Sequence, residues 1–297
     1  MSVLPRQLLS PFNGSGRARF ALLVFGYVML VGLCLGSLWM ADELSLGRNP
    51  LANLVKSVGE FAYPSFLDVW FGPERLEYRS DDGTLLRVED RRVVEAQFLS
   101  ALARATWVTF QIATLGSLLG AVLALPLGLL SARNLGAPRW LAWGAKGVLD
   151  VLRAIHTLVF GLVLVGIVGL GPTAGILAIA LHSMGTYGKL YAESVESLDM
   201  GAVHAVQATG ASRTQVFFNA VWPAVLPQFV SNHLYVWEFN IRDSTILGLI
   251  GAGGLGLLIS EAVSLFQWSR LATLLLVVIA LVVMFDTLSR RIRQALL

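Results

Sequence analysis

Long apolar stretches without charges are the feature that most constrains how this chain folds. The first, from Phe20 to Met40, holds 21 residues and no Asp, Glu, Lys or Arg. At about 1.5 Å per residue, a helix of that length crosses the ~30 Å hydrocarbon core of a bilayer. The stretch exceeds the ~7–15-residue core of a cleavable signal peptide, and Ala41-Asp42 follow in place of a small-x-small cleavage site. We therefore expect residues 20–40 to remain as a first transmembrane helix.

Similar stretches continue along the chain. Ala105 to Ala132 carries no charge, and Ala154 to Gly188 extends the pattern over 35 residues, which is too long for one helix. Gly169-Leu170-Gly171-Pro172 divides this stretch into a tight hairpin of two helices, because proline cannot continue a helix and glycine permits the turn. The first helix of the hairpin is expected to begin near Trp140, and two more apolar segments run from Ala224 to Leu249 and from Leu271 to Phe285. The sequence thus predicts an all-α integral membrane fold of about six transmembrane helices.

The overall composition agrees with this class. Hydrophobic residues make up 56% of the chain and charged residues 14%, with a mean hydropathy of +0.69, whereas soluble domains carry roughly 25% charged residues. The net charge of +3 is too small to indicate a nucleic-acid partner. Cys34 is the single cysteine, so neither a disulfide framework nor a zinc site is expected, and we expect it to pack as a small apolar residue.

Basic residues near the helix ends predict the orientation in the membrane, because Lys and Arg are enriched in short cytoplasmic loops. We expect six helices in an inner membrane, with both termini on its cytoplasmic side. This arrangement places three basic clusters on that side: Arg6, Arg17 and Arg19; Arg133, Arg139 and Lys146; and Arg290, Arg291 and Arg293. Residues 1–19 are then a cytoplasmic N-terminus and residues 41–95 an extracytoplasmic segment. Within that segment, Leu76 to Val88 alternates around Asp81-Asp82-Gly83-Thr84, which indicates a small β-hairpin insertion.

The segment from Leu198 to Pro223 predicts a helical knob between the fourth and fifth spans. Asp199 can cap a short helix that ends at Thr209, and Gly210 suits the left-handed conformation that closes such a helix. Ser212-Arg213-Thr214-Gln215 has the form of a capping box for a second short helix, which Pro223 is expected to stop. Such a knob suits a groove on a partner protein. An ordinary helical loop is the alternative, whereas a DNA-binding helix-turn-helix is disfavoured because the second helix leads directly into a span.

The knob resembles the coupling motif of ABC importer permeases, which reads Glu-Ala-Ala, three residues, Gly, nine residues, Ile-x-Leu-Pro. His204-Ala205-Val206, Gly210 and Ala220-Val221-Trp222-Pro223 keep both spacings. The resemblance implies coupling helices at 199–223 that dock onto a partner ATPase through His204, Ala205, Gly210, Ser212, Arg213 and Pro223. Because His204 stands where the family has Glu, a salt bridge from that position to the ATPase is not expected.

Further motifs extend the resemblance over residues 96–297, the expected permease core. They are similar to phosphonate-type permeases and read Arg153-Ala154-Ile155-His156, Val168-Gly169-Leu170-Gly171-Pro172, Ala208-Thr209-Gly210-Ala211, Glu238-Phe239-Asn240-Ile241-Arg242-Asp243-Ser244-Thr245 and Gly251-Ala252-Gly253-Gly254-Leu255-Gly256. The resemblance implies a homodimeric channel for phosphonates or related phosphorus oxyanions, with two ATPase subunits, an extracytoplasmic binding protein and membrane lipids as partners. Phosphite, hypophosphite, another small oxyanion and an amino acid are alternative cargoes.

The chain has no phosphate-binding loop of the form Gly-x-x-x-x-Gly-Lys-Ser/Thr, so we expect ATP and magnesium on the partner ATPase and no cofactor on this chain. Gly251, Gly253, Gly254 and Gly256 lack the βαβ context of a dinucleotide fingerprint, and we expect them to let backbones approach or bend as a gate near the outer mouth. A membrane-embedded enzyme is disfavoured, because the predicted spans hold no constellation of nucleophile and base or of metal ligands. An ion-coupled secondary transporter is also disfavoured. That class would show inverted repeats and no docking knob, whereas this sequence shows no such repeat and predicts the knob.

Charged residues inside the predicted spans are candidates for the substrate pathway, because charge in a bilayer is costly and turns toward a cavity or a partner. Glu238 and Arg242 lie four apart on one helical face, about 22 and 28 Å from Pro223 at ~1.5 Å per residue, which predicts a position in the outer half. A guanidinium fork matches the oxygens of a phosphorus oxyanion, although an ion pair that only stabilises the helix is the alternative. The other candidates are Arg153, His156, His182, Asn240, Asp243 and Ser244, and for the two histidines hydrogen-bonded packing is the alternative role.

Overall fold

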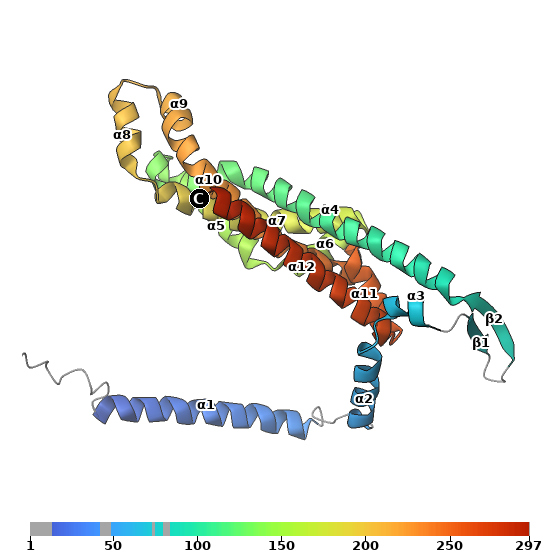
Figure 1. Ribbon diagram of the computed structural model, residues 1–297. Coiled ribbons are helices and arrows are strands. Elements are labelled where there is room, and N and C mark those ends of the chain that lie inside the picture. Colours follow the sequence, from blue (N-terminus) through green and yellow to red (C-terminus); the bar gives the residue numbers. More distant parts are fainter. Residues whose placement is uncertain (1–13, 42–48, 73–74, 80–83, 297) are drawn as a thin grey trace, which may run out of the picture. The chain divides into compact units, whose positions relative to one another are not determined.

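The computed structural model describes residues 14–41, 49–72, 75–79 and 84–296, and the chain divides into two compact units, Met1–Lys56 and Ser57–Leu297. In the first unit, α1 (Gly14–Met40) is one uninterrupted helix (Figure 1). Its side chains from Arg19 onward are nearly all exposed, as expected of a single span in contact with lipid. Arg6 of the predicted N-terminal basic cluster lies outside the described residues. α2 (Pro50–Phe61) crosses the boundary between the two units.

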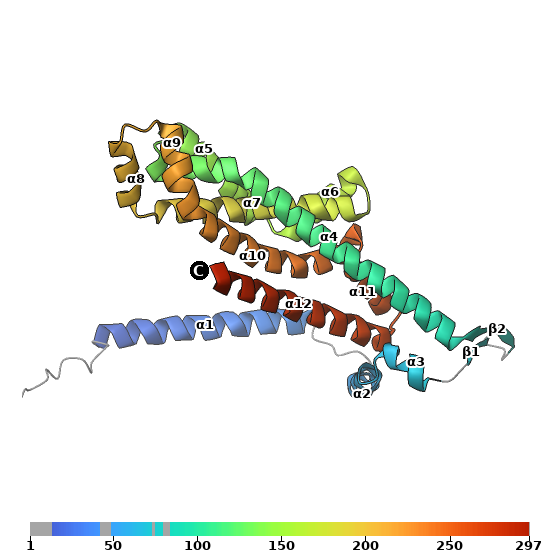
Figure 2. The same cartoon turned by 45° about the horizontal axis from the view of Figure 1, so that its top comes forward.

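Four long helices run side by side through the second unit, as Figures 1 and 2 show: α4 (Arg91–Ser131), α7 (Pro172–Glu196), α10 (Trp222–Leu247) and α12 (Trp268–Leu296). α5 (Arg139–Ala154) and α6 (Thr157–Val168) both pack along α7, and α11 (Leu255–Ser264) packs against α12 and α4. α6 and α7 are joined by the three residues 169–171, so the predicted tight hairpin is confirmed.

The seam between α4 and α7 is built from small residues. Four of them recur every fourth position on α4: Gly116, Gly120, Ala124 and Gly128. A Cβ atom at Gly120 would lie 2.9 Å from the carbonyl oxygen of Ala180, so glycine is needed for this approach of the two backbones. Lipid tails are as apolar as leucine, so helices in a bilayer are held together largely by such close packing.

Three described helices are long and apolar enough to cross a membrane: Arg19–Met40, Arg91–Ser131 and Trp268–Ala295. The number rises to five if each of two bent pairs forms one span, namely Arg139–Ala154 with Thr157–Val168 and Arg213–Ala252 with Leu255–Ser264. α7, the predicted fourth span, is not among them, because its small and polar residues, among them Gly, Ser, Thr and His, lower its mean hydropathy. The predicted total of about six helices therefore stays a prediction.

The third predicted span is not one straight helix. α5 and α6 meet at 89°, with Ile155 and His156 between them. α5 is amphipathic, with Leu149 buried and Trp143 exposed, whereas α6 is apolar on all sides. The start near Trp140 is correct for α5 alone. The prediction of a continuous helix is wrong, because the break carries neither glycine nor proline to signal it.

A short antiparallel sheet precedes α4. β1 (Arg75–Arg79) pairs with β2 (Leu85–Asp90), while residues 81–83 of the predicted turn lie outside the described residues. Two short helical turns, η2 (Ser65–Leu67) and α3 (Asp68–Phe71), tie the preceding chain to the bundle. The Ser65 hydroxyl lies 3.1 Å from that of Thr273 on α12, and the first residue of α4, Arg91, pairs with Asp68.

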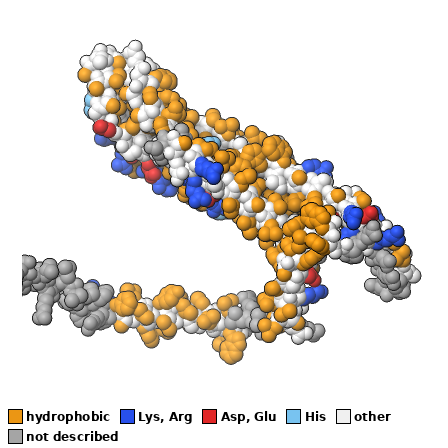
Figure 3. Space-filling model, in the orientation of Figure 1, with side chains coloured by type: hydrophobic (Ala, Val, Ile, Leu, Met, Phe, Trp, Pro, Cys, Tyr) orange, Lys and Arg blue, Asp and Glu red, His pale blue; other side chains and the backbone are white. Residues whose placement is uncertain are grey.

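The surface of the second unit is divided by the kind of side chain. On the face in Figure 3, basic side chains gather near both ends of the bundle, and a mostly apolar band lies between them. This distribution is typical of a protein whose middle faces hydrocarbon and whose ends face headgroups and water.

Candidate functional site

The knob between α7 and α10 forms as its capping residues predict. α8 (Met200–Ala208) begins at Asp199, whose carboxylate accepts a hydrogen bond from the Gly201 N–H at 2.9 Å. Gly210 follows the end of α8 with φ = 80°, the left-handed conformation. The capping box of Ser212 is present at the start of α9 (Arg213–Val216). Each cap uses groups two or three positions away, which explains why the local sequence was sufficient.

Pro223 does not stop the second short helix, so that prediction is wrong. The chain continues from α9 through a π-helical turn, η4 (Phe217–Val221), into α10 without a break. Pro223 lies in the first turn of α10, directly after this turn. The wider backbone of a π-helical turn leaves room for a proline ring that would otherwise collide with the preceding turn. A continuous helix therefore leads from the knob into the bundle.

The knob has a buried side and an exposed side. Val203, Val216 and Val221 are buried in one cluster with Tyr191 and Val195 of α7. All six residues predicted to couple to an ATPase are exposed: His204, Ala205, Gly210, Ser212, Arg213 and Pro223. The Nδ1 atom of His204 lies 3.2 Å from the side-chain oxygen of Gln207 on its own helix. The valines thus hold the knob onto α7, while the predicted docking residues stay accessible.

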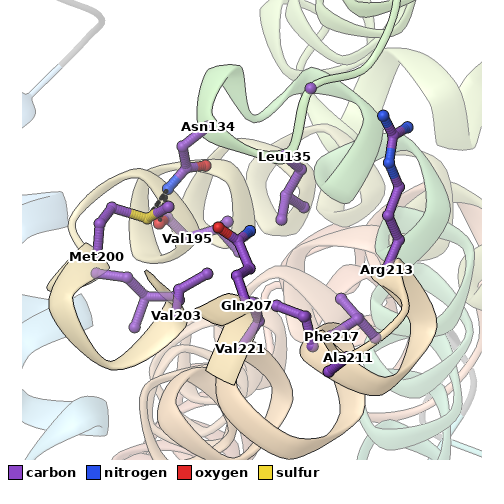
Figure 4. A pocket seen from close by; sticks show the side chains of 13 residues that line it. Asn134, Leu135, Val195, Met200, Val203, Gln207, Ala211, Arg213, Phe217 and Val221 are labelled. Atoms are coloured by element: carbon purple, nitrogen blue, oxygen red, sulfur yellow. Dashed lines mark hydrogen bonds between the residues drawn. The ribbon is translucent and has the colours of Figure 1, made fainter. Parts of the chain in front are cut away.

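A cavity of about 410 Å³ lies between the knob and η3 (Arg133–Leu135). Figure 4 shows apolar side chains such as Val195, Val203 and Phe217 around it. The side-chain nitrogen of Asn134 donates to the Val195 carbonyl at 2.6 Å, and the Asn134 Oδ1 atom is buried without a hydrogen-bond partner. The interface beneath the knob is therefore not fully packed. It contains a cavity and one buried polar atom, Asn134 Oδ1, without a hydrogen-bond partner.

Glu238 on α10 is the charged centre of the predicted pathway. Its side chain is 10% exposed, and its two oxygens lie 2.7 Å from a nitrogen of Arg242 and 3.7 Å from a nitrogen of Arg293 on α12. Arg293 was not predicted to belong here, because only tertiary packing brings α12 beside α10.

The contact with Arg293 also relates Glu238 to the C-terminal end of α12. Arg293 belongs to the basic end of α12, which is predicted to be cytoplasmic, so a cytoplasmic end of α12 and a Glu238 in the outer half are not compatible with each other. Pro223 lies within a helix that continues into the knob, so it is not the helix start from which the predicted depth was counted.

Asn240 lies in a buried contact between three helices and not beside open space. Its side-chain nitrogen donates to the hydroxyls of Ser117 on α4 at 2.7 Å and Ser183 on α7 at 2.8 Å. Because the amide is fully engaged and 2% exposed, it joins α4, α7 and α10.

Asp243 and Ser244 also serve contacts inside the bundle. The Asp243 carboxylate accepts from the Thr157 hydroxyl at 2.8 Å, which joins α10 to the first residue of α6. Ser244 is fully buried, and its hydroxyl donates to the Ile241 carbonyl within α10 at 2.8 Å.

The break between α5 and α6 brings the two candidate histidines together. His156 caps the first turn of α6, and a nitrogen of His182 on α7 lies 2.9 Å from the Ile155 carbonyl. The two imidazole rings are 6.3 Å apart. Arg153 pairs with Asp150 on its own helix at 3.0 Å. The sequence motif at 153–156 therefore marks the bend itself.

The predicted glycine gate forms a bend after α10. The bend consists of a π-helical turn, η5 (Gly248–Ala252), and the two residues that follow it. The helix that ends at Ala252 and α11 meet there at 59°. The Gly251 carbonyl accepts from the Gly171 N–H at 3.0 Å, which ties the bend to the α6–α7 turn. On its other side, the Leu255 N–H donates to the Thr109 hydroxyl of α4 at 2.8 Å. This bend contains or directly adjoins all four predicted residues, Gly251, Gly253, Gly254 and Gly256.

One exposed face of α10, which was not predicted, has the spacing of a helix-packing seam. Its residues alternate by four and three positions: Tyr235, Phe239, Arg242 and Ile246 on α10, and Leu249 in the π-helical turn η5 that follows. Arg242 is the one charged member of these five, with its side chain 44% exposed and its guanidinium 4.9 Å from the centre of the Phe239 ring. The stripe was hidden in the sequence because apolar residues occur on both faces of α10, and six of its eleven buried residues are apolar too.

Solved structures share this fold. A chain from inward-facing structures of the MetNI methionine ABC transporter superposes with a TM-score of 0.61, covering 68% of this chain and 98% of that chain at 22% identity. The fold is therefore that of an ABC importer permease. Within the part of the chain that the structure describes, no group of three or more His, Cys, Asp or Glu side chains could hold a metal ion.

Residues 124–297 match the family described as binding-protein-dependent transport system inner membrane component. The chain belongs to this family of transport permeases. One relative is the putative phosphite transport system permease protein HtxC of Stutzerimonas stutzeri, 37% identical over 199 residues, which are 67% of this chain and 71% of that protein. Another is the phosphite transport system permease protein PtxC of the same organism, 38% identical over 63% of this chain and 68% of that protein. The predicted resemblance to permeases of the phosphonate and phosphite type is thus confirmed.

Proposed function

We propose that this chain forms the transmembrane pathway of an ABC importer that carries phosphite, phosphonates or a related phosphorus oxyanion. The family assignment and the names of the two relatives support this cargo class. In this proposal the chain binds no nucleotide. Two partner ATPase subunits hold ATP and magnesium, and an extracytoplasmic binding protein delivers the oxyanion.

The same proposal assigns the parts of the chain to the two sides of the membrane. Residues 1–19 are cytoplasmic, 20–40 form the first transmembrane helix, 41–95 are extracytoplasmic, and 96–297 are the permease core with coupling helices at 199–223. The assignment is supported by the positions of the knob and the β1–β2 hairpin at opposite ends of the second unit (Figure 1). Both termini are then cytoplasmic.

Arg242 is the single observation that carries the proposed pathway. A partly exposed guanidinium on an otherwise apolar helix face would be costly in contact with lipid. Its stripe also has the spacing with which helices pair. We therefore assign this face of α10 to the boundary with a second copy of the chain, where Arg242 faces the water-filled path of the substrate.

The charges around Arg242 favour an anion. Arg242 and Arg293 both lie beside Glu238, so two cations share one carboxylate and the cluster keeps one net positive charge. Glu238 holds the guanidinium in place, and the planar fork of Arg242 matches two oxygens of a phosphorus oxyanion. The histidines at the α5–α6 break and the glycine bend after α10 are the proposed moving parts of the path.

The cargo is tested by reconstituting the chain with its ATPase and binding protein in vesicles. ATP hydrolysis is measured with phosphite, hypophosphite, methylphosphonate, phosphate and methionine. We expect stimulation by at least one of the reduced-phosphorus or phosphonate ligands and none by methionine. Stimulation by methionine alone, or by no phosphorus oxyanion, would reject the cargo class.

The pathway role is tested with Arg242→Gln in the same vesicles. Because a hydrogen bond to a charged group contributes about 1.5–3 kcal/mol, uptake should fall about tenfold or more, and Arg242→Lys should retain an intermediate rate. Arg290→Gln is the matched control, since Arg290 forms an i,i+4 pair with Asp286 at the same 2.7 Å but lies outside the α10 stripe. Equal uptake by the Arg242→Gln variant and the control would leave Arg242 with a structural role only.

A further inference from the structure

A basic crevice beside α5 is not used by the proposed transport pathway. It has a volume of about 620 Å³ and lies between α5 and the end of α4 with its connection to α5. Its basic lining residues are Arg133, Arg139 and Lys146, and Trp143 and Asp150 also line it. The crevice is far larger than a single tetrahedral oxyanion, so an ion of that kind alone would leave most of it empty.

The crevice carries excess positive charge. Neither Arg139 nor Lys146 has an ion-pair partner among the described residues, whereas the Arg133 guanidinium lies 4.0 Å from the Glu196 carboxylate, which also accepts from the Arg133 backbone N–H at 3.0 Å. The one acidic side chain of the lining, Asp150, is already engaged by Arg153 at 3.0 Å. Two cations in this crevice therefore lack a counter-charge from the protein.

An apolar, aromatic surface adjoins these charges on the same helix. Trp143, in the crevice, is 82% exposed, and Trp140 on the neighbouring face is 76% exposed. Val151 continues that neighbouring face and is also exposed. Trp beside Lys or Arg is characteristic of helices at a membrane interface, where the ring lies at headgroup level and the cation meets phosphate.

We propose that this crevice binds the headgroup of an anionic phospholipid. The lipid phosphate lies against Arg139 and Lys146, and an acyl chain follows the apolar face of α5 at Trp140 and Val151. Charge, aromatic side chains and volume together favour a lipid over a free oxyanion, because a free ion would use the cations and leave the exposed side chains of Trp140, Trp143 and Val151 uncovered. Basic pockets beside membrane helices are a known physical basis for recognising anionic headgroups.

The proposal is tested by quenching of Trp143 fluorescence with brominated lipids. The full chain is placed in phosphatidylcholine vesicles with increasing brominated phosphatidylglycerol, and the signal of Trp143 is the difference between the unmodified chain and Trp143→Phe. A basic side chain near an anionic surface favours binding by about fivefold, so Arg139→Gln with Lys146→Gln should raise the half-saturating lipid fraction about 30-fold. The double variant Arg139→Lys with Lys146→Arg keeps both charges and should bind as the unmodified chain does.

Two controls separate this site from general attraction to a charged membrane. Arg290→Gln with Arg291→Gln removes the same charge from the end of α12 and should leave the quenching curve unchanged. Brominated phosphatidylcholine should quench Trp143 without saturation at low lipid fraction. Equal curves for the two brominated lipids, or an equal loss in both double-glutamine variants, would overturn the proposal. Displacement of phosphatidylglycerol by millimolar phosphite would also overturn it, because the crevice would then be a site for the free oxyanion.

Discussion

The α4–α7 seam and the α8–α9 knob both depend on glycine, but for different physical reasons. At Gly120 in the seam the backbone is an ordinary helix, and glycine is required because the carbonyl of Ala180 lies where a side chain would begin. At Gly210 in the knob no atom lies within 4 Å of the Cβ position, and glycine is required because φ is 80°. The seam is thus limited by space and the knob by backbone conformation, so substitutions in the two regions should fail differently.

Gly120→Leu should have the largest effect, because it forces a side chain into the backbone of α7. Overpacking a core costs about 1–3 kcal/mol or more, and here the obstacle is backbone and cannot rotate away. We expect the chain to lose its monodisperse peak in gel filtration after extraction in detergent. Gly166→Leu on α6 is the matched control, because nothing lies within 4 Å of its Cβ position. Aggregation of both variants alike would show that added bulk, and not the seam, is responsible.

The knob was more predictable from sequence than the bundle beneath it. Asp199, Gly210 and Ser212 specify caps through neighbours a few positions away, so the local sequence is enough to identify them. The 89° bend between α5 and α6 and the contact of Glu238 with Arg293 depend on residues far apart in the chain. The hydropathy of Ala154 to Gly188 identified apolar helices, but it carries no information on where their axes turn or which charges meet.

Gly210→Val should have a smaller effect on folding and a specific effect on assembly. A left-handed conformation costs a residue with a side chain about 1–2 kcal/mol, and valine is branched at the Cβ atom. The melting temperature of the isolated chain should change little, while its affinity for the ATPase should fall about tenfold or more. Gly169→Val is the control, because Gly169 also has positive φ and open space but lies in the α6–α7 turn, outside the knob and the cavity beneath it. Normal assembly of the Gly210→Val variant would argue against docking through the elbow.

Asp199→Ala should have the smallest effect, confined to the first turn of α8. The variant removes the hydrogen bond to the Gly201 N–H, and loss of an N-cap costs about 0.5–2 kcal/mol of helix stability. Amide hydrogen exchange in α8 should therefore accelerate about fivefold, while exchange in the α4–α7 seam stays unchanged. Asp199→Asn separates cap from charge, since Asn caps a helix as well as Asp does. If exchange in α8 accelerates equally in both variants, the negative charge and not the hydrogen bond stabilises this helix. If neither variant differs from the unmodified chain, the valines packed against α7 hold α8 in place without its cap.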